Sequence, residues 1–412
     1  MNRQKSIAFL CHPYHRGGVT RWMADAAAAF ANKGWQVHFV TVEPTVVFFS
    51  GAGRETLLQL LKKTNSSVQV HSKKVGREFE LGTPAYRIFI YRQLLSGLPT
   101  GTPVILSDDA TVWAAATDMH TSYPIIGVLH ADELHYYDLA KRYSDKVAVF
   151  TCVSERVHRV LLERVPQIPA ASVHTIPCGI NLPSETKPRN LPHILQLAYV
   201  GRITQYQKRT GDLAAIAVAL REQHVPFHLH IIGDGTDKNA LQETFRSKDL
   251  GHVATFHGWL PQKDVTSYLA ASDILILTSD FEGTPIAMME ALAAGCGVVG
   301  TRVSGIEDYE SNPLAADCYG VYTVGDIAEA IKKIMIVASV TTTFREKAAR
   351  KLAESEFSMD ICIERYTKAM GDIKTNYADP GPSSLPFTAS LHSKLLAAAR
   401  YLKATLMQGK SS

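Results

Sequence analysis

Short apolar runs alternate with longer stretches of helical periodicity along most of the chain. In the first part, we expect an Ala-rich helix at 19–32 and strands at 7–11, 37–42, 104–106, 125–129, 147–151 and 173–176. In the second part, we expect strands at 195–200, 227–232, 253–256, 274–277 and 297–301. Helical patterns accompany those strands at 211–223, 237–245, 263–271, 286–294, 324–337 and 343–354. Short apolar runs between helices are typical of buried parallel strands, so the pattern predicts an α/β fold with doubly wound parallel sheets.

A polar, Pro-rich stretch interrupts this alternation at residues 181–192. Such a composition is typical of a linker between domains. Ligands of open α/β sheets bind beyond the carboxyl ends of the strands. Two doubly wound domains would therefore hold a ligand in the cleft between them.

The composition is that of a globular protein of two or three domains. The chain has 412 residues, of which 46% are hydrophobic and 20% are charged. No apolar run approaches the ~20 residues that span a membrane, and the first apolar segment, at 7–10, is too short for a signal peptide. The six cysteines include no C-x-x-C pair, which favours reduced thiols in a cytoplasmic protein over disulfides or a zinc site.

The charge is distributed unevenly along the chain. Lys and Arg exceed Asp and Glu by six in residues 1–190 and by four in residues 390–412, whereas residues 191–389 carry a net charge of −6. Apolar residues also recur at helical spacing in the basic tail. We therefore predict a basic amphipathic helix over 388–410 that lies on an anionic membrane surface. A helix that packs on the protein's own surface is the alternative.

The segment with the most chemical information follows the predicted strand at 274–277. Pro285 suits the first position of a helix, and Gly283 allows the backbone to approach a ligand closely. A helix N-terminus favours an anion such as phosphate. Glu290 lies seven residues after Gly283, on nearly the same helix face, and Glu282 lies at the helix mouth. Phosphate beside hydroxyl-binding carboxylates describes a nucleotide-sugar site; the alternative is a capped helix with two solvated glutamates.

Two basic residues flank the loop after the predicted strand at 195–200. Arg202 and Lys208 could together neutralise a diphosphate and stabilise it as a leaving group without a metal ion. A solvated basic loop is the alternative interpretation.

Three other positions follow predicted strands. Gly17 and Gly18 precede the first helix without forming a G-x-G-x-x-G fingerprint, so a ligand contact and a plain turn are both open. Gly233 lies in a Gly-Asp-Gly turn, a common type of turn that could also touch a ligand. His130 directly follows the strand at 125–129 and is placed to face the cleft, although a lone histidine is more often structural.

In their order and spacing, these segments resemble the family 4 retaining glycosyltransferases of the GT-B fold. The resemblance covers about residues 5–370. It implies two Rossmann-like domains that face an interdomain cleft, an acceptor-side domain at 1–182 and a nucleotide-sugar-binding domain at 193–357. A helix within 358–378 would return to the first domain, which leaves 379–412 as a linker and the tail helix.

The resemblance also implies roles for individual residues. Arg202 and Lys208 match the pair that contacts the diphosphate, Glu282 the residue that binds the donor sugar, and His130 a histidine near its C6 hydroxyl. It implies catalytic roles for Arg202, Lys208, His130 and Glu282. It implies donor-binding roles for Gly17, Gly18, Gly233, Gly283, Thr284, Pro285, Ile286 and Glu290, the last with the ribose. The spacing from Arg202 to Lys208 is one residue longer than the commonest family form, and Cys178-Gly179-Ile180-Asn181 replaces the frequent Asn-Gly-Val-Asp.

The implied reaction moves a sugar, with retention, from a UDP- or GDP-sugar to a saccharide or lipid-linked saccharide. Such a reaction belongs to the biosynthesis of cell-surface polysaccharides or glycolipids. The resemblance implies no metal and no cofactor, and we expect no nucleic-acid partner. Three alternatives remain: a sugar phosphorylase, for which no pyridoxal lysine is evident; a nucleotide-sugar epimerase or hydrolase; and a non-catalytic nucleotide-sugar-binding subunit.

Overall fold

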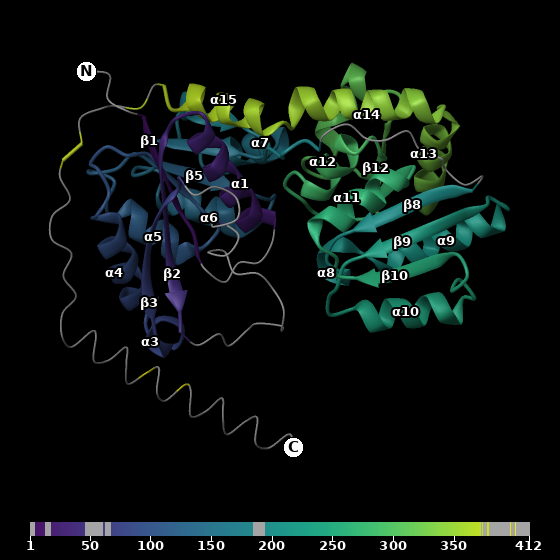
Figure 1. Ribbon diagram of the computed structural model, residues 1–412, viewed down its shortest axis with the longest axis horizontal. Coiled ribbons are helices and arrows are strands. Elements are labelled where there is room, and N and C mark those ends of the chain that lie inside the picture. The colour runs from purple at the N-terminus through teal and green to yellow at the C-terminus, as the bar shows by residue number, and fades with distance from the viewer. Residues whose placement is uncertain are drawn as a thin grey trace.

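Two α/β lobes lie side by side, and the helices α14 (Thr342–Glu356) and α15 (Met359–Ala369) run from the second lobe to the first (Figure 1). The computed structural model describes residues 5–12, 18–45, 61, 67–183, 194–371, 373, 377–378, 396 and 400. The predictions for Gly17 and, apart from positions 396 and 400, for the tail helix at 388–410 fall outside these residues, as does most of the predicted linker.

The first lobe is built on a parallel sheet. Its described strands are β1 (Ser6–Leu10), β2 (Gln36–Pro44), β3 (Gln69–Val75), β4 (Val104–Leu106), β5 (Ile125–Leu129), β6 (Val149–Cys152) and β7 (Val173–Thr175). They follow the order β3-β2-β1-β4-β5-β6-β7. The accompanying helices are α1 (Gly18–Asn32), α3 (Arg77–Leu81), α4 (Pro84–Leu95), α5 (Ala110–Thr117), α6 (Leu134–Arg142) and α7 (Glu155–Arg164), with a short 3₁₀ turn at Ala170–Ser172.

The second lobe repeats this architecture. Its described strands are β8 (Leu195–Val200), β9 (Phe227–Ile232), β10 (Ala254–Gly258), β11 (Ile274–Leu277), β12 (Gly297–Thr301) and β13 (Tyr319–Tyr322), in the order β10-β9-β8-β11-β12-β13. Its helices are α8 (Gln205–Lys208), α9 (Gly211–Glu222), α10 (Lys238–Ser247), α11 (Gln262–Ala271), α12 (Ile286–Ala293), α13 (Ile327–Ser339) and α14 (Thr342–Glu356), with 3₁₀ turns at Glu307–Tyr309 and Pro313–Ala315. The predicted fold class, two doubly wound parallel sheets, is confirmed.

Local chemistry explains two of the places where the elements differ from the predictions. Helix α13 begins at residue 327 rather than 324 because the Asp326 side chain accepts a hydrogen bond from the Glu329 N–H and caps the helix. Strand β3, with the sequence QVHSKKV, was not predicted. It is an edge strand whose residues are mostly exposed or half-buried, so it lacks the apolar run of a central strand.

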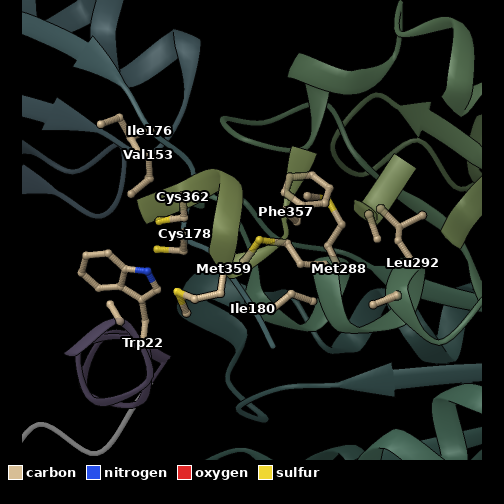
Figure 2. Packing of buried hydrophobic residues seen from close by; sticks show 14 of the residues in the cluster. Trp22, Val153, Ile176, Cys178, Ile180, Met288, Leu292, Phe357, Met359 and Cys362 are labelled. Atoms are coloured by element: carbon tan, nitrogen blue, oxygen red, sulfur yellow. The ribbon is translucent and has the colours of Figure 1, made fainter. Parts of the chain in front are cut away.

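One apolar cluster extends from the first lobe into the second (Figure 2). Trp22 of α1 points toward Cys178 and Cys362, and Cys362 lies on the last described helix, α15 (Met359–Ala369). Helix α15 packs against α1, and Tyr366 Oη lies 3.2 Å from Thr151 Oγ1 on β6. The chain therefore returns from the second lobe to the first, and this helix fastens the lobes together.

None of the described helices is both long and apolar enough to cross a bilayer. All six cysteines are buried thiols in the structure.

Candidate active site

Loops at the carboxyl ends of strands in both sheets contact each other. The Asp132 N–H, beyond β5, donates to the Glu282 carbonyl oxygen, beyond β11, at 3.0 Å. The Thr284 hydroxyl donates to the Val153 carbonyl oxygen beyond β6. The two lobes therefore meet at the edge where open α/β sheets bind ligands.

Gly283 makes this close approach possible. A Cβ atom at this position would overlap the His130 carbonyl oxygen of the first lobe. We predicted that Gly283 allows close approach to a ligand, and the structure places the backbone of the opposite lobe against it. Thr284, the next residue, is buried in the same contact.

Lys208 and Glu282 form an ion pair between the loops after β8 and β11. Glu282 is only 6% exposed, and Ser279 Oγ donates a second hydrogen bond to its Oε1 at 2.6 Å. The Thr278 hydroxyl donates to the Lys208 carbonyl oxygen and so ties the two loops together. The alternative of a solvated Glu282 is wrong, because its carboxylate is buried and accepts hydrogen bonds from Lys208 and Ser279.

Arg202 lies on the same loop as Lys208 but has a different environment. It is exposed, and its Nη2 donates to Gln207 Oε1 at 2.7 Å. Gln207 in turn donates through Nε2 to the Phe281 carbonyl oxygen at 3.3 Å, and its own carbonyl accepts from the Asp280 N–H at 2.9 Å. Gln207 therefore holds Arg202 beside the Glu282 loop, with its guanidinium accessible to an anion.

Glu290 has partners other than those of Glu282. Its Oε1 accepts a hydrogen bond from Gln262 Nε2 at 2.6 Å. Burial raises the Glu290 pKa to about 7, although the positive charge of Arg21 on α1 opposes this shift. The predicted alignment of Glu290 with Gly283 does not apply, because the helix begins at Ile286.

The start of α12 faces the start of α1. Pro285 occupies the N-cap of α12 rather than its first helical position. A Cβ atom at Gly18 would lie 2.8 Å from Ile286 Cδ1, so these two predicted donor-binding residues are neighbours across the lobes. The first turns of both helices therefore border the same region.

His130 is buried at the end of β5, with 8% of its surface exposed. Burial lowers its pKa to about 4, against the opposing effect of Asp108, so the ring is neutral at pH 7. Its ring centroid lies 5.4 Å from that of Trp22. Within the described part of the chain, neither ring nitrogen has a hydrogen-bond partner. A neutral imidazole of this kind can bind a ligand hydroxyl.

Gly233 supports the loop that carries Arg202. Its φ of +146° lies in the region that favours glycine, and a Cβ atom there would overlap the Gly201 carbonyl oxygen. The structure thus shows a backbone contact that brings the ends of β8 and β9 together.

Sequence reasoning missed several residues of this region. No motif with a recognisable spacing contains Ser279, Gln262 or Arg21. Ser279 is 3 residues from its partner Glu282, whereas Gln262 and Arg21 are 28 and 269 residues from Glu290.

Across the residues that the structure describes, no group of three or more His, Cys, Asp or Glu side chains is arranged to hold a metal ion.

Two family profiles match the chain, one on each lobe. Residues 16–183 match Glycosyltransferase Family 4, and residues 190–351 match Glycosyl transferases group 1. Glycogen synthase of Mycobacterium tuberculosis is 28% identical over 171 residues, 42% of this chain and 40% of the relative. The amylovoran biosynthesis glycosyltransferase AmsK of Erwinia amylovora is 29% identical over 185 residues, 43% of this chain and 44% of the relative. The matches thus span less than half the length of these two relatives.

Solved structures share the architecture at lower identity. TarM of S. aureus, crystallised with fondaparinux, alpha-GlcNAc-glycerol and UDP, has a TM-score of 0.71 at 12% identity, with 90% of this chain and 100% of that chain covered. HepE of Anabaena, crystallised with UDP and glucose, has a TM-score of 0.68 at 14% identity, with the same coverage. At such identities the likeness shows the GT-B fold alone.

Proposed function

We propose, from the premise that this chain belongs to the family 4 glycosyltransferases, that it moves a sugar from a nucleoside diphosphate to a saccharide acceptor. The observation that carries the proposal is the Lys208–Glu282 ion pair. It joins a cation that can hold a diphosphate to a carboxylate that can bind sugar hydroxyls. The pair lies where the lobes meet, immediately before α12, whose N-terminus favours phosphate.

The proposed chemistry retains the anomeric configuration. The bond between the anomeric carbon and the diphosphate oxygen breaks, and the acceptor oxygen forms its new bond on the same face. The acceptor proton passes to a diphosphate oxygen, so no protein nucleophile is required. Lys208 and Arg202 would stabilise the charge that develops on the leaving diphosphate.

The other residues would position the donor. Glu282 would accept hydrogen bonds from the sugar hydroxyls, and neutral His130 would bind the hydroxyl at C6. Glu290 would accept from the ribose hydroxyls in place of its hydrogen bond from Gln262. Holding both reactants in this geometry removes several kcal/mol of the entropic barrier.

The names of the similar proteins support a nucleotide donor and a polysaccharide product. TarM and HepE were both crystallised with UDP. AmsK is named for amylovoran biosynthesis, and WcaL of Escherichia coli for putative colanic acid biosynthesis. We therefore propose a UDP- or GDP-sugar as donor and a growing surface polysaccharide or its lipid-linked precursor as acceptor.

A thermal-shift screen of UDP-, GDP- and ADP-sugars tests the donor. A donor present at 100 times its dissociation constant should stabilise the protein by about 2.7 kcal/mol. Products formed from the stabilising donor and a panel of pyranoside acceptors are then identified by mass spectrometry, and their anomeric configuration by NMR. Stabilisation by no nucleotide sugar would contradict the proposal, and an inverted product would contradict retention.

We propose that the reaction needs no metal ion, because Lys208 and Arg202 would supply the positive charge that a metal supplies elsewhere. Turnover should therefore survive EDTA, and loss of turnover that Mg²⁺ or Mn²⁺ restores would overturn this part of the proposal.

The membrane contact of the tail stays a prediction. Arg400 Nη1 donates to the carbonyl oxygens of Leu81 and Gly82, at 3.0 and 3.3 Å. This contact at the end of α3 favours the alternative in which the tail packs on the protein itself. Co-sedimentation with anionic liposomes should fall when residues 385–412 are deleted if the tail binds membrane, and unchanged binding would exclude the tail as an anchor.

A further inference from the structure

Helix α8 exposes an aromatic ring next to the Lys208–Glu282 pair. Tyr206 is 84% exposed, although it lies two residues before Lys208. Its ring meets that of Phe281 edge to face, with centroids 5.6 Å apart and planes at 73°. Phe281 directly precedes Glu282, so both rings belong to loops that carry predicted site residues.

Hydrogen bonds fix the loops that carry this aromatic pair. Gln207, between Tyr206 and Lys208, bonds both to the Phe281 carbonyl oxygen and to the Asp280 N–H. Figure 1 shows α8 on the side of the second lobe that faces the first. The exposed ring is thus held at a defined place beside the site.

Polar groups accompany the aromatic pair. Arg202 is held by Gln207, the residue after Tyr206. Asp280, the residue before Phe281, has a carboxylate with 37% of its side chain exposed, 3.4 Å from Arg209 Nη1. An apolar ring flanked by charged donors and acceptors matches a pyranose, which presents C–H groups on one face and hydroxyls around its rim.

We propose that Tyr206 and Phe281 form a stacking subsite for a pyranose ring of the acceptor saccharide. This inference rests on the proposed glycosyl transfer. The donor sugar needs the buried Glu282 carboxylate, whereas Tyr206 lies outside it and is open to solvent. A ring stacked on Tyr206 would therefore belong to the incoming acceptor, next to the position from which its hydroxyl attacks.

Saturation-transfer NMR with methyl pyranosides and maltotriose, in the presence of UDP, tests the subsite. The wild-type protein and Tyr206→Phe should transfer saturation to the sugar C–H protons, because both keep the ring. Tyr206→Ala should weaken sugar binding about ten-fold, which corresponds to about 1.4 kcal/mol. Phe344→Ala is the matched control, because Phe344 is a 68% exposed aromatic on α14 of the same lobe.

Three results would overturn the subsite. Tyr206→Ala could bind the sugars as tightly as the wild type, or the wild type could show no saturation transfer to any of these sugars. A loss of UDP affinity in Tyr206→Ala would instead assign the ring to the nucleobase.

Kinetics separate this inference from the proposed function. If only the subsite is wrong, Tyr206→Ala transfers sugar with an unchanged KM for the acceptor. If the proposed function is wrong, the wild type transfers no sugar at all.

Discussion

Glu282 is a buried carboxylate that accepts hydrogen bonds from Lys208 and Ser279. A charged hydrogen bond in a poorly solvated place contributes more than one on the surface, and loss of one partner leaves the other unsatisfied. The sequence indicated that Lys208 and Glu282 bind different parts of one ligand. The structure adds that each holds the other in place.

Lys208→Ala should lower turnover by roughly 10²–10³, the scale of losing one electrostatic stabiliser of the transition state. Loss of the buried ion pair should also reduce the free energy of unfolding by about 1–3 kcal/mol. Steady-state kinetics and urea denaturation measure the two effects. Lys333→Ala, which removes a surface ion pair with Glu310, is the control and should change neither appreciably. Near-normal turnover of Lys208→Ala would remove this lysine from the proposed role.

His130 should make stability depend on pH. Its pKa is lowered from 6.5 to about 4, so the unfolded chain binds a proton at higher pH than the folded protein does. Stability from the neutral ring is fully present above about pH 6.5 and is lost as the pH falls to about 4. Between pH 7 and pH 4, the free energy of unfolding of the wild type should fall by about 3 kcal/mol more than that of His130→Gln. Urea titrations across this range measure the difference, and parallel pH profiles would contradict it.

At the scale of elements, the loop before α12 is closely packed on both sides. Gly283 has no room for a Cβ atom beside His130, and a Cβ atom at Gly305 would overlap the Gly283 carbonyl oxygen. These contacts join the loops after β5, β11 and β12, so the α12 start is positioned by both lobes.

Gly283→Ala should push the lobes apart at this point. Separation relieves the overlap without unfolding either sheet, so we expect a small change in thermal stability but a fall in kcat/KM of roughly 10². Small-angle scattering should show a larger radius of gyration. Gly251→Ala is the control, because a Cβ atom there meets no atom within 4 Å. Unchanged kinetics in Gly283→Ala would show that the loop can move aside at little cost.

The elements that the sequence predicted well are the central strands. Strands β4, β5, β8, β9, β11 and β12 have the predicted bounds, because most of their residues are apolar and buried. The edge strand β3 and the short helix α8 have no such pattern. Helix α8 forms within the loop where the Arg202-to-Lys208 spacing is one residue longer than in the common family form.

At the scale of the whole molecule, α15 couples the lobes. Met359 and Cys362 join the apolar cluster that contains Trp22 (Figure 2). The buried Tyr366 lies beside β6, with its Oη 3.2 Å from Thr151 Oγ1. The backbones of Ile180 and Ser358 also form a β-bridge where the two crossing segments meet. Unfolding of either lobe would disrupt this shared packing.

A chain that ends after Phe357 should therefore unfold in two separate thermal transitions, the first-lobe transition being the lower. Removal of α15 exposes apolar surface on α1, at a cost of several kcal/mol. A chain that ends after Ala378 retains α15 and the Ala378-to-Thr121 backbone hydrogen bond, so it is the matched control and should unfold in one transition. Calorimetry distinguishes the two, and identical profiles would show that α15 does not couple the lobes.

The sequence by itself determined the α/β alternation, the central strands and the order of Arg202, Lys208, Glu282 and Glu290. Each of these features depends on an apolar run or a short motif, and the residues of one run or motif lie within a few positions of one another. Only the tertiary structure decided that Glu282 pairs with Lys208 while Glu290 accepts from Gln262. It also decided that Gly283 packs against His130 and that α1 faces α12. Such contacts join residues tens to hundreds of positions apart, and their geometry follows from how two closely packed lobes fit together.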